Sequence, residues 1–583
     1  MSSAERSASR RASSRFLLAV AGVGLVYVTA LLSLRPFVPG TLGHVDAASK
    51  IWQVESFLQG QRHLVYPARG LDPDYRYIPD WYAVRVGGRP YSIHLNLLAW
   101  INYVAVLVVG RLAYNLVPLV SSIAAVTLSA WLVRRHGLAD DRNLWRVILG
   151  VGLCTPMLYY SVLTLEHIVA AVFAAGAFLL AAEALKVLAS GTPKLDWRFL
   201  AGSGACLGLA TLARGECGLL AVAMGLIVMV LARRAGMMRT LLSGAAMALG
   251  GFLVLGGYFL LFPDGLKIQM AFSVQGTKEQ IRLSLRLWKL TLFAGLGSRL
   301  TSMVGETLSD WISAVGGASL GVAMCMGLLA RTRHVVMRYA ATVLFVLGLG
   351  VILVALEPQG LVVVCPFVVP AAFIVRGNAD WKNPAAQLVI GTSAAFLALL
   401  WLVLTTPGAA QFGPRFLVPV IAPLAAVVLG GLFVRLERVP DRWLRVMLVL
   451  ALLTAFATEI KGIVQCRRGA TYARTTQSEL EKLPAPIVVF SPYLTKEFYL
   501  YQSPKVLMNT PVLQAMDEEQ FVEIIELLKG KGITDFGMVC NDDLAADHLK
   551  TLKDAGGTVA GTRKLPHNGT AYLVKLSADV DQE

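Results

Sequence analysis

A few ionisable residues occupy short turns between long apolar runs. Glu166 and His167 fall in YYSVLTLEHIVAAVF, where no other charge is nearby. Ionisable groups at membrane depth are costly and usually mark a function or a partner. A carboxylate beside an imidazole could bind a divalent metal ion or hydrogen-bond a sugar. The alternative is an acid that only favours a helix start, with His167 facing lipid headgroups.

Two further turns each carry a lone arginine. Arg214 stands with Glu216 in TLARGECGLL, and Arg415 stands in FGPRFLVP. The guanidinium fork matches phosphate oxygens, so these turns could hold a phosphate at headgroup level. The alternative is an arginine that only reaches toward lipid phosphate. Lys278 and Arg282 are further candidates, although amphipathic surface helices routinely carry basic faces.

Asp46 lies about a dozen residues after the first apolar run, in HVDAASKIWQVESFLQG. A carboxylate held within hydrogen-bond reach of an acceptor hydroxyl could remove its proton as a general base. The alternative is an exposed loop acid, or a helix cap, because Asp46 stands close to the start of a segment that could be helical.

The composition indicates what positions these residues. Of the 583 residues, 56% are hydrophobic and 15% are charged, against about 25% charged in ordinary soluble domains. Apolar runs near 20 residues recur, and this length spans a bilayer as a helix. The sequence predicts a polytopic α-helical membrane protein with thirteen spans near residues 16–34, 112–133, 147–165, 168–182, 199–213, 218–232, 240–262, 311–330, 339–356, 360–375, 386–406, 416–434 and 443–460.

The distribution of positive charge predicts the topology. The net charge is +16, and the basic residues concentrate at the N-terminus and in alternate gaps such as RRHGLADDRNLWR, while the intervening short gaps are nearly bare. Basic loops stay in the cytoplasm, so residues 1–15 are expected to be a cytoplasmic basic tail. This placement argues against nucleic-acid binding. The seven cysteines show no paired spacing that would indicate a disulfide framework or a zinc site.

Three regions outside the spans are then expected on the outer face. The loop 35–111 ends in an apolar stretch, 94–109, that is expected to lie in the membrane interface. The loop 263–310 has the spacing of an amphipathic surface helix. Residues 465–583 alternate β-rich runs with helical stretches, which predicts a small extracytoplasmic α/β domain.

This organisation resembles the GT-C superfamily of integral-membrane glycosyltransferases, which use sugars linked to polyprenyl phosphate. The nearest analogues are the aminoarabinose transferases and the protein O-mannosyltransferases. The resemblance rests on the basic N-terminus, one helix and a long loop with an early acid. It also rests on GGRPYSIHLNLLAWINY, on the LEH turn, and on the ATLARGECGLL and FGPRFLVPVIAPL segments. It covers nearly the whole chain in organisation and gives residues 16–462 a GT-C-like transmembrane domain.

The resemblance implies roles for the same residues. Asp46 matches the first-loop catalytic acid, Glu166 matches the acid of the next outer turn, and Arg214 and Arg415 stand where such enzymes hold lipid phosphate. His94, in the loop-helix motif, is a candidate ligand or a filler. The implied reaction is an inverting transfer from a polyprenyl-phosphate sugar to a glycan, lipid or protein acceptor at the outer face of a bacterial inner membrane. A divalent ion at Glu166 and His167 could assist.

Two other classes of function remain open on the sequence. A transporter or flippase of a lipid-linked saccharide would show polar residues near the bilayer midplane, whereas here the ionisable groups gather at one face. A scaffold that only presents the C-terminal region would leave the charges of the outer turns without a role.

Overall fold

The computed structural model describes most of the chain. The described residues are 3–34, 45–79, 83–92, 97–189, 196–233, 236–263, 306–329, 335–354, 361–373, 382–403, 415–439, 441–492, 509–565 and 569–577. His94, Lys278 and Arg282 lie outside them, as does most of the predicted amphipathic loop 263–310.

The chain divides into two compact units. The first contains residues Met1–Leu31, Pro118–Leu261 and Thr277–Ile463, and the second contains Leu32–Val117, Phe262–Gly276 and Val464–Glu583. The loop that follows the first apolar helix therefore belongs to the same unit as the C-terminal segment. All of the outer-turn candidates, from Glu166 to Arg415, belong to the first unit.

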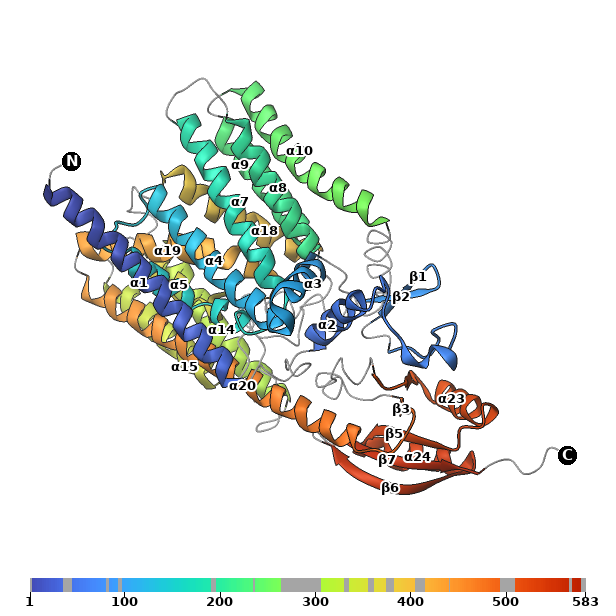
Figure 1. Ribbon diagram of the computed structural model, residues 1–583. Coiled ribbons are helices and arrows are strands. Elements are labelled where there is room, and N and C mark those ends of the chain that lie inside the picture. Colours follow the sequence, from blue (N-terminus) through green and yellow to red (C-terminus); the bar gives the residue numbers. More distant parts are fainter. Residues whose placement is uncertain are drawn as a thin grey trace. The chain divides into compact units, whose positions relative to one another are not determined.

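The first unit is built from helices (Figure 1). They are α1 (Ser3–Ser33), α4 (Ala113–Arg135), α5 (Leu144–Leu153), α6 (Met157–Tyr160), α7 (Glu166–Ala189), α8 (Trp197–Ala213), α9 (Cys217–Ala232), α10 (Met237–Leu261), α14 (Glu306–Leu329), α15 (Val335–Val354), α16 (Leu361–Val364), α17 (Val368–Ala372), α18 (Pro384–Val403), η6 (Arg415–Leu417), α19 (Val418–Arg438) and α20 (Arg442–Glu481), which continues into the second unit.

Six stretches of helix among the described residues are long and apolar enough to cross a membrane. They are Ser14–Ser33, Leu97–Arg135, Glu166–Lys186, Met237–Leu261, Arg415–Arg438 and Arg442–Glu481. Five shorter apolar helices accompany them, in α5, α9, α14, α15 and α18. The helical architecture is as predicted, and the count of thirteen spans stays a prediction.

Two predicted spans are wrong as single helices. The stretch 147–165 is helical only as far as Leu153 and then forms the short α6, and the stretch 360–375 is split into α16 and α17. A proline follows each break, at Pro156 and Pro366. Proline disfavours helical backbone in the residue before it and removes an N–H donor. Hydropathy does not detect this effect, so it overestimated the length of both helices.

Glycines allow α8 and α10 to lie in direct backbone contact. A Cβ atom at Gly204 would overlap the carbonyl oxygen of Met247, and one at Gly250 would overlap the carbonyl oxygen of Ala201. Small residues that let two backbones approach are the usual device of helix packing in membranes, where dispersion replaces the hydrophobic effect. These contacts set the spacing of α8, which ends immediately before Arg214.

We therefore expect Gly250→Ala to destabilise the protein. The added methyl group must push α8 and α10 apart, and overpacking of this kind costs about 1–3 kcal/mol. Gly257→Ala on the same helix meets no atom within 4 Å and should be neutral or stabilising, by up to about 1 kcal/mol from helix propensity. Thermal unfolding in detergent measures both, and equal stability of the two variants would contradict the predicted backbone contact.

The N-terminal part of the second unit contains α2 (Val45–Leu58), η1 (Pro67–Gly70), the antiparallel pair β1 (Ala83–Val86) and β2 (Arg89–Ser92), α3 (Leu97–Val109) and η2 (Gly110–Leu112). The Glu55 carboxylate joins α2 to the end of α3. It accepts two bonds from Arg111, at 2.9 and 2.8 Å, and one from the Tyr114 hydroxyl at 3.0 Å. Gly110, with φ +66°, separates α3 from α4.

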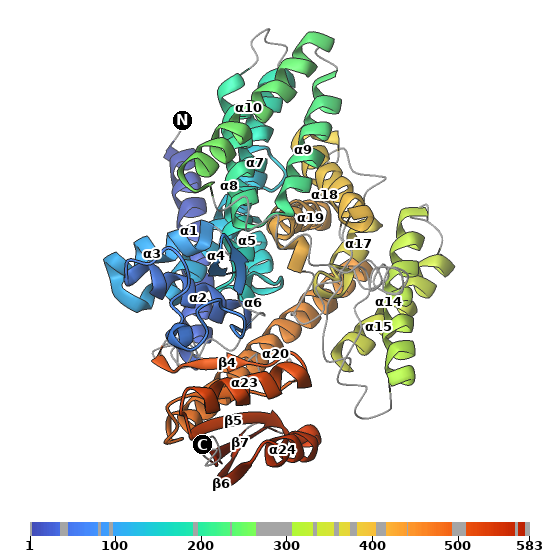
Figure 2. The ribbon, with the colours of Figure 1, turned by 90° about the vertical axis from the view of Figure 1, so that its right-hand side faces the viewer.

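A five-stranded mixed sheet forms the C-terminal part of the second unit (Figure 2). Its order is β4 (Val512–Gln514), β3 (Val488–Phe490), β5 (Asp535–Asn541), β7 (Gly569–Leu576) and β6 (Gly557–Leu565). The first three strands are parallel and the last two join antiparallel. Helices α23 (Glu518–Gly530) and α24 (Ala545–Asp554) follow β4 and β5, which gives the alternation that the sequence predicts.

The first loop and this sheet share one hydrophobic core. Trp52 and Tyr66 from the loop lie in the same buried cluster as Phe490 and Phe521. Polar contacts add to it: Glu523 accepts bonds from Arg76 at 2.8 Å and from the Tyr77 hydroxyl at 3.2 Å. The first loop is thus a structural part of the unit that contains the sheet.

All seven cysteines are free thiols. Cys154, Cys217, Cys365, Cys466 and Cys540 are buried, Cys206 is half-buried, and Cys325 on α14 is exposed.

Candidate functional site

The candidate site lies where several helices of the first unit begin or end. Glu166 is the first residue of α7, Arg214 follows the last residue of α8, and Glu216 directly precedes α9. Arg214 has extended backbone, at φ −147° and ψ 118°. The chain therefore leaves α8 at Arg214 and enters α9 at Cys217, which brings two charged residues of opposite sign into one turn.

Arg214 lies between two carboxylates. Its Nη1 donates to Glu166 Oε1 at 3.3 Å, its Nε donates to Glu216 Oε1 at 2.6 Å, and its Nη2 also contacts that oxygen. The side chains of Arg214 and Glu166 are 6% and 7% exposed. A guanidinium held by one buried and one half-buried acid makes charge-assisted bonds in fixed directions, so the α7 and α8–α9 turns form one polar centre.

The electrostatics of this centre keep Arg214 charged. Burial alone would lower the pKa of Arg214, but the Glu216 and Glu166 carboxylates raise it above the usual arginine value. Removing one member of a buried ion pair leaves the other charge uncompensated, at a cost of about 3–5 kcal/mol. The network therefore contributes to the local structure as well as to any chemistry.

Tyr160 and His167 form the aromatic wall of the site. Their rings stack with centroids 5.0 Å apart and an interplanar angle of 21°, and both residues are fully buried. His167 Nδ1 lies 3.7 Å from Glu166 Oε1, which exceeds hydrogen-bond distance. The imidazole therefore stacks on the Tyr160 ring, and its Nδ1 makes no direct hydrogen bond to Glu166 Oε1.

Arg415 comes from a distant part of the sequence to the same centre. Its guanidinium lies 4.8 Å from the centroid of the Phe416 ring, and that of Arg214 lies 5.5 Å from the same ring. Both arginines therefore contact one aromatic side chain, which is buried. The structure brings Glu166, His167, Arg214, Glu216 and Arg415 together, and their chemical roles stay predictions.

Glu459 is a buried acid that the sequence reasoning did not single out. It lies within α20, is fully buried, and accepts a bond from the backbone N–H of Tyr159 at 3.2 Å. No hydrogen-bond partner of its Oε1 is present among the described residues. Because Tyr159 precedes Tyr160, Glu459 supports the segment that carries the aromatic wall. The only signal in the sequence was one acid in an apolar run.

A divalent ion does not fit the described side chains in this arrangement. Within the described ranges, no group of three or more His, Cys, Asp and Glu side chains could hold a metal ion. The Glu166 carboxylate faces Arg214 instead, and a guanidinium competes directly with a cation for it. We therefore derive no step through a metal.

The structure does not place the remaining predicted residues relative to this centre. Asp46 is in the first turn of α2, which belongs to the second unit, and its side chain is outside the described atoms. His94, Lys278 and Arg282 are outside the described residues. Their predicted roles, as base and as substrate or phosphate ligands, stay predictions.

No protein-family model matches this chain, and no curated protein sequence matches it. Among solved structures it is similar to ArnT from Cupriavidus metallidurans bound to undecaprenyl phosphate, with 13% identity and a TM-score of 0.46 over 97% of this chain and 99% of that chain. The apo state of the same protein gives 14% identity and a TM-score of 0.44 over 98% and 100%. Because both TM-scores are below 0.5, the function proposed below rests on the residues of this chain.

Proposed function

We propose that this protein is a membrane glycosyltransferase that moves a sugar from a polyprenyl-phosphate donor to an acceptor. The observation that carries the proposal is the buried Glu166–Arg214–Glu216 network beside Arg415, which gathers acids and arginines at the ends of apolar helices. A donor of this kind has a polar sugar phosphate on an apolar chain. It needs cationic and hydrogen-bonding groups at headgroup level and apolar surface next to them.

The arginines would act on the leaving group. When the bond between the anomeric carbon and the phosphate oxygen breaks, negative charge develops on the phosphate, and fixed cations aimed at this charge lower the barrier. Of the five guanidinium N–H groups of Arg214, the bonds to Glu166 and Glu216 use three. Two donors remain for a phosphate, and Arg415 supplies a second cation.

The carboxylates would act on the sugar and the acceptor. In the proposed reaction Asp46 removes the proton of the acceptor hydroxyl, whose oxygen then attacks the anomeric carbon and inverts its configuration. Glu166 would hydrogen-bond the sugar and hold Arg214 in place. The two acids and two arginines of the centre have formal charges that sum to zero. A bound phosphate would therefore add net negative charge, which the cations predicted at Lys278 and Arg282 would offset.

The distribution of basic gaps supports a placement of this centre on the outer face of a cytoplasmic membrane. The turns that contain Glu166, Arg214 and Arg415 alternate with the basic gaps along the chain. We propose that the N-terminus is cytoplasmic and that the sheet-containing unit is extracytoplasmic, where it could bind the acceptor glycan.

The alternative of a transporter or flippase is less well supported. The network is buried at helix ends, whereas coupling sites of transporters lie in discontinuous helices near the midplane. Glu459 is the observation that favours the alternative, because it is a buried acid inside a helix long and apolar enough to span the membrane.

A transfer assay tests the proposal. The purified full-length protein is incubated with a panel of radiolabelled polyprenyl-phospho-sugars and with membrane glycans, lipids and proteins as acceptors. We expect one donor to lose its sugar to an acceptor and to release polyprenyl phosphate. Movement of intact donor across proteoliposomes with no release of polyprenyl phosphate would establish the flippase instead. Chelation of divalent ions in the same assay tests the predicted metal, and the structure leads us to expect unchanged turnover.

A further inference from the structure

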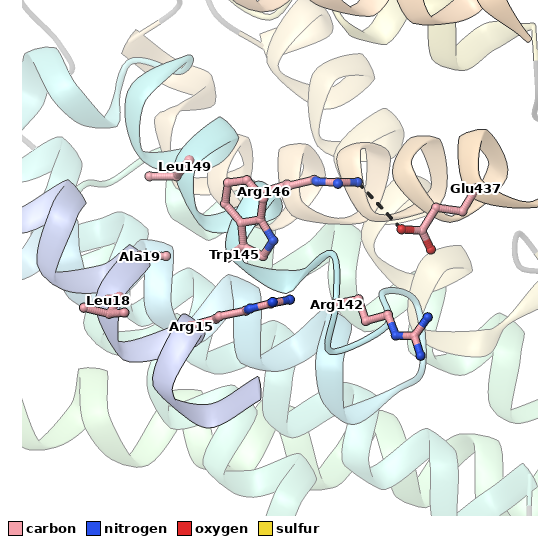
Figure 3. A pocket seen from close by; sticks show the side chains of 8 residues that line it. All are labelled: Arg15, Leu18, Ala19, Arg142, Trp145, Arg146, Leu149 and Glu437. Atoms are coloured by element: carbon pink, nitrogen blue, oxygen red, sulfur yellow. Dashed lines mark ion pairs between the residues drawn. The ribbon is translucent and has the colours of Figure 1, made fainter. Parts of the chain in front are cut away.

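A separate pocket lies in the first unit, among residues that the proposed reaction does not use. It is lined by Arg15, Leu18, Ala19, Arg142, Trp145, Arg146, Leu149 and Glu437, and its volume is about 630 Å³. These residues come from α1, from the turn before α5, from α5 and from the end of α19 (Figure 3). The pocket is therefore formed by three helices that are distant in sequence.

The polar part of this pocket is cationic. Three arginines and one acid give it a net positive charge. Arg146 Nη1 lies 3.7 Å from Glu437 Oε1 and donates to Asn143 Oδ1 at 2.8 Å. The Arg146 guanidinium also lies 5.4 Å from the Trp145 ring centroid. The Arg146–Glu437 ion pair therefore neutralises one arginine, and the charges of Arg15 and Arg142 remain in the lining of the pocket.

The other part of the pocket is apolar and continues onto an exposed apolar surface. Leu18, Ala19 and Leu149 line it. Leu18 is 71% exposed and its neighbour Leu17 is 65% exposed, as expected for side chains that face lipid. Trp145 combines polar and apolar character, and indole rings favour the boundary between headgroups and acyl chains. A ligand of the pocket should thus have an anionic end and an apolar end.

We infer that this pocket binds an anionic phospholipid of the cytoplasmic leaflet. Arg15 belongs to the basic N-terminal segment, and Arg142 and Arg146 belong to the basic gap after α4, so all three are on the side to which positive charge is assigned. Basic pockets between membrane helices on this side bind anionic headgroups. The phosphodiester contacts the three arginines, and an acyl chain lies along Leu18 and Leu149.

Binding of short-chain lipids to the full-length protein in detergent tests the inference. Phosphatidylglycerol and phosphatidylcholine with equal acyl chains are titrated separately, and bound lipid is counted by native mass spectrometry. We expect phosphatidylglycerol to bind about tenfold more tightly, and the triple variant Arg15→Gln, Arg142→Gln, Arg146→Gln to lose this preference. Glu437→Gln should raise the affinity for phosphatidylglycerol, a gain that misfolding cannot produce.

The matched control removes the same charge elsewhere. Arg198, Arg233 and Arg239 lie in other basic gaps and do not line the pocket, so their combined change to glutamine should keep the preference. An equal loss in the control would mean diffuse surface charge and would overturn the inference. It would also be overturned if glycerol phosphate, which has no acyl chain, bound as tightly as phosphatidylglycerol, because the site would then hold a free anion.

Discussion

Arg214→Gln is expected to abolish sugar transfer and to lower the stability of the protein at the same time. The variant loses the cation that we propose faces the phosphate, and an electrostatic contact of this kind is worth about 10²–10³ in turnover. It also leaves the buried Glu166 and the half-buried Glu216 without their guanidinium, and a buried acid that loses its partner costs about 3–5 kcal/mol. Radiolabelled transfer and thermal unfolding in the same detergent measure the two losses.

A double variant separates these effects. Arg214→Gln combined with Glu216→Gln removes one stranded acid, so part of the thermal stability should return while transfer stays lost. Arg135→Gln is the matched control: this arginine pairs with Glu183 at 2.7 Å, but its side chain is 57% exposed, and exposed pairs contribute about 0–1 kcal/mol. If turnover returned together with stability in the double variant, Arg214 would be only a structural residue.

Asp46→Asn is expected to lower kcat/KM for transfer by about 10²–10⁴, the usual contribution of a general base. Asparagine has nearly the same shape but accepts no proton at neutral pH, so thermal stability should be unchanged. The assay uses the donor identified from the panel and follows the acceptor product. Asp74→Asn makes the same change in an exposed part of the same loop and should keep full turnover. Full turnover of Asp46→Asn would remove the assignment of the base.

The centre at the helix ends was partly predictable from the sequence. Charges are rare between apolar runs, so Glu166, Arg214 and Arg415 stood out, and the alternation of basic gaps placed their turns on one side. Sequence spacing could not show which charges pair. Arg214 contacts Glu166 because α7 and α8 pack side by side, and residues outside the turns, such as Gly202 of α8 against Leu180 of α7, take part in that packing.

Residues that support the centre were missed for a related reason. Phe416 and Tyr160 look like ordinary apolar side chains in a membrane sequence, and only tertiary contacts place one against two guanidiniums and the other against His167. The end of one helix was also predicted wrongly, because a polar segment was assumed not to be helical. Residues after 460 are polar, which ended the predicted span, yet α20 continues to Glu481 because polar residues form helices readily outside an apolar environment.

The single exposed cysteine, Cys325, can be used to test whether its helix lies in the bilayer, with no engineered label site. Cys325 lies exposed on an apolar helix, whereas five of the other cysteines are buried and Cys206 is half-buried. A charged reagent cannot readily enter the acyl-chain region of a bilayer, whereas an apolar reagent can. Slow reaction with a charged maleimide and faster reaction with a membrane-soluble one would therefore show, on the unmodified chain, whether α14 is embedded in the bilayer.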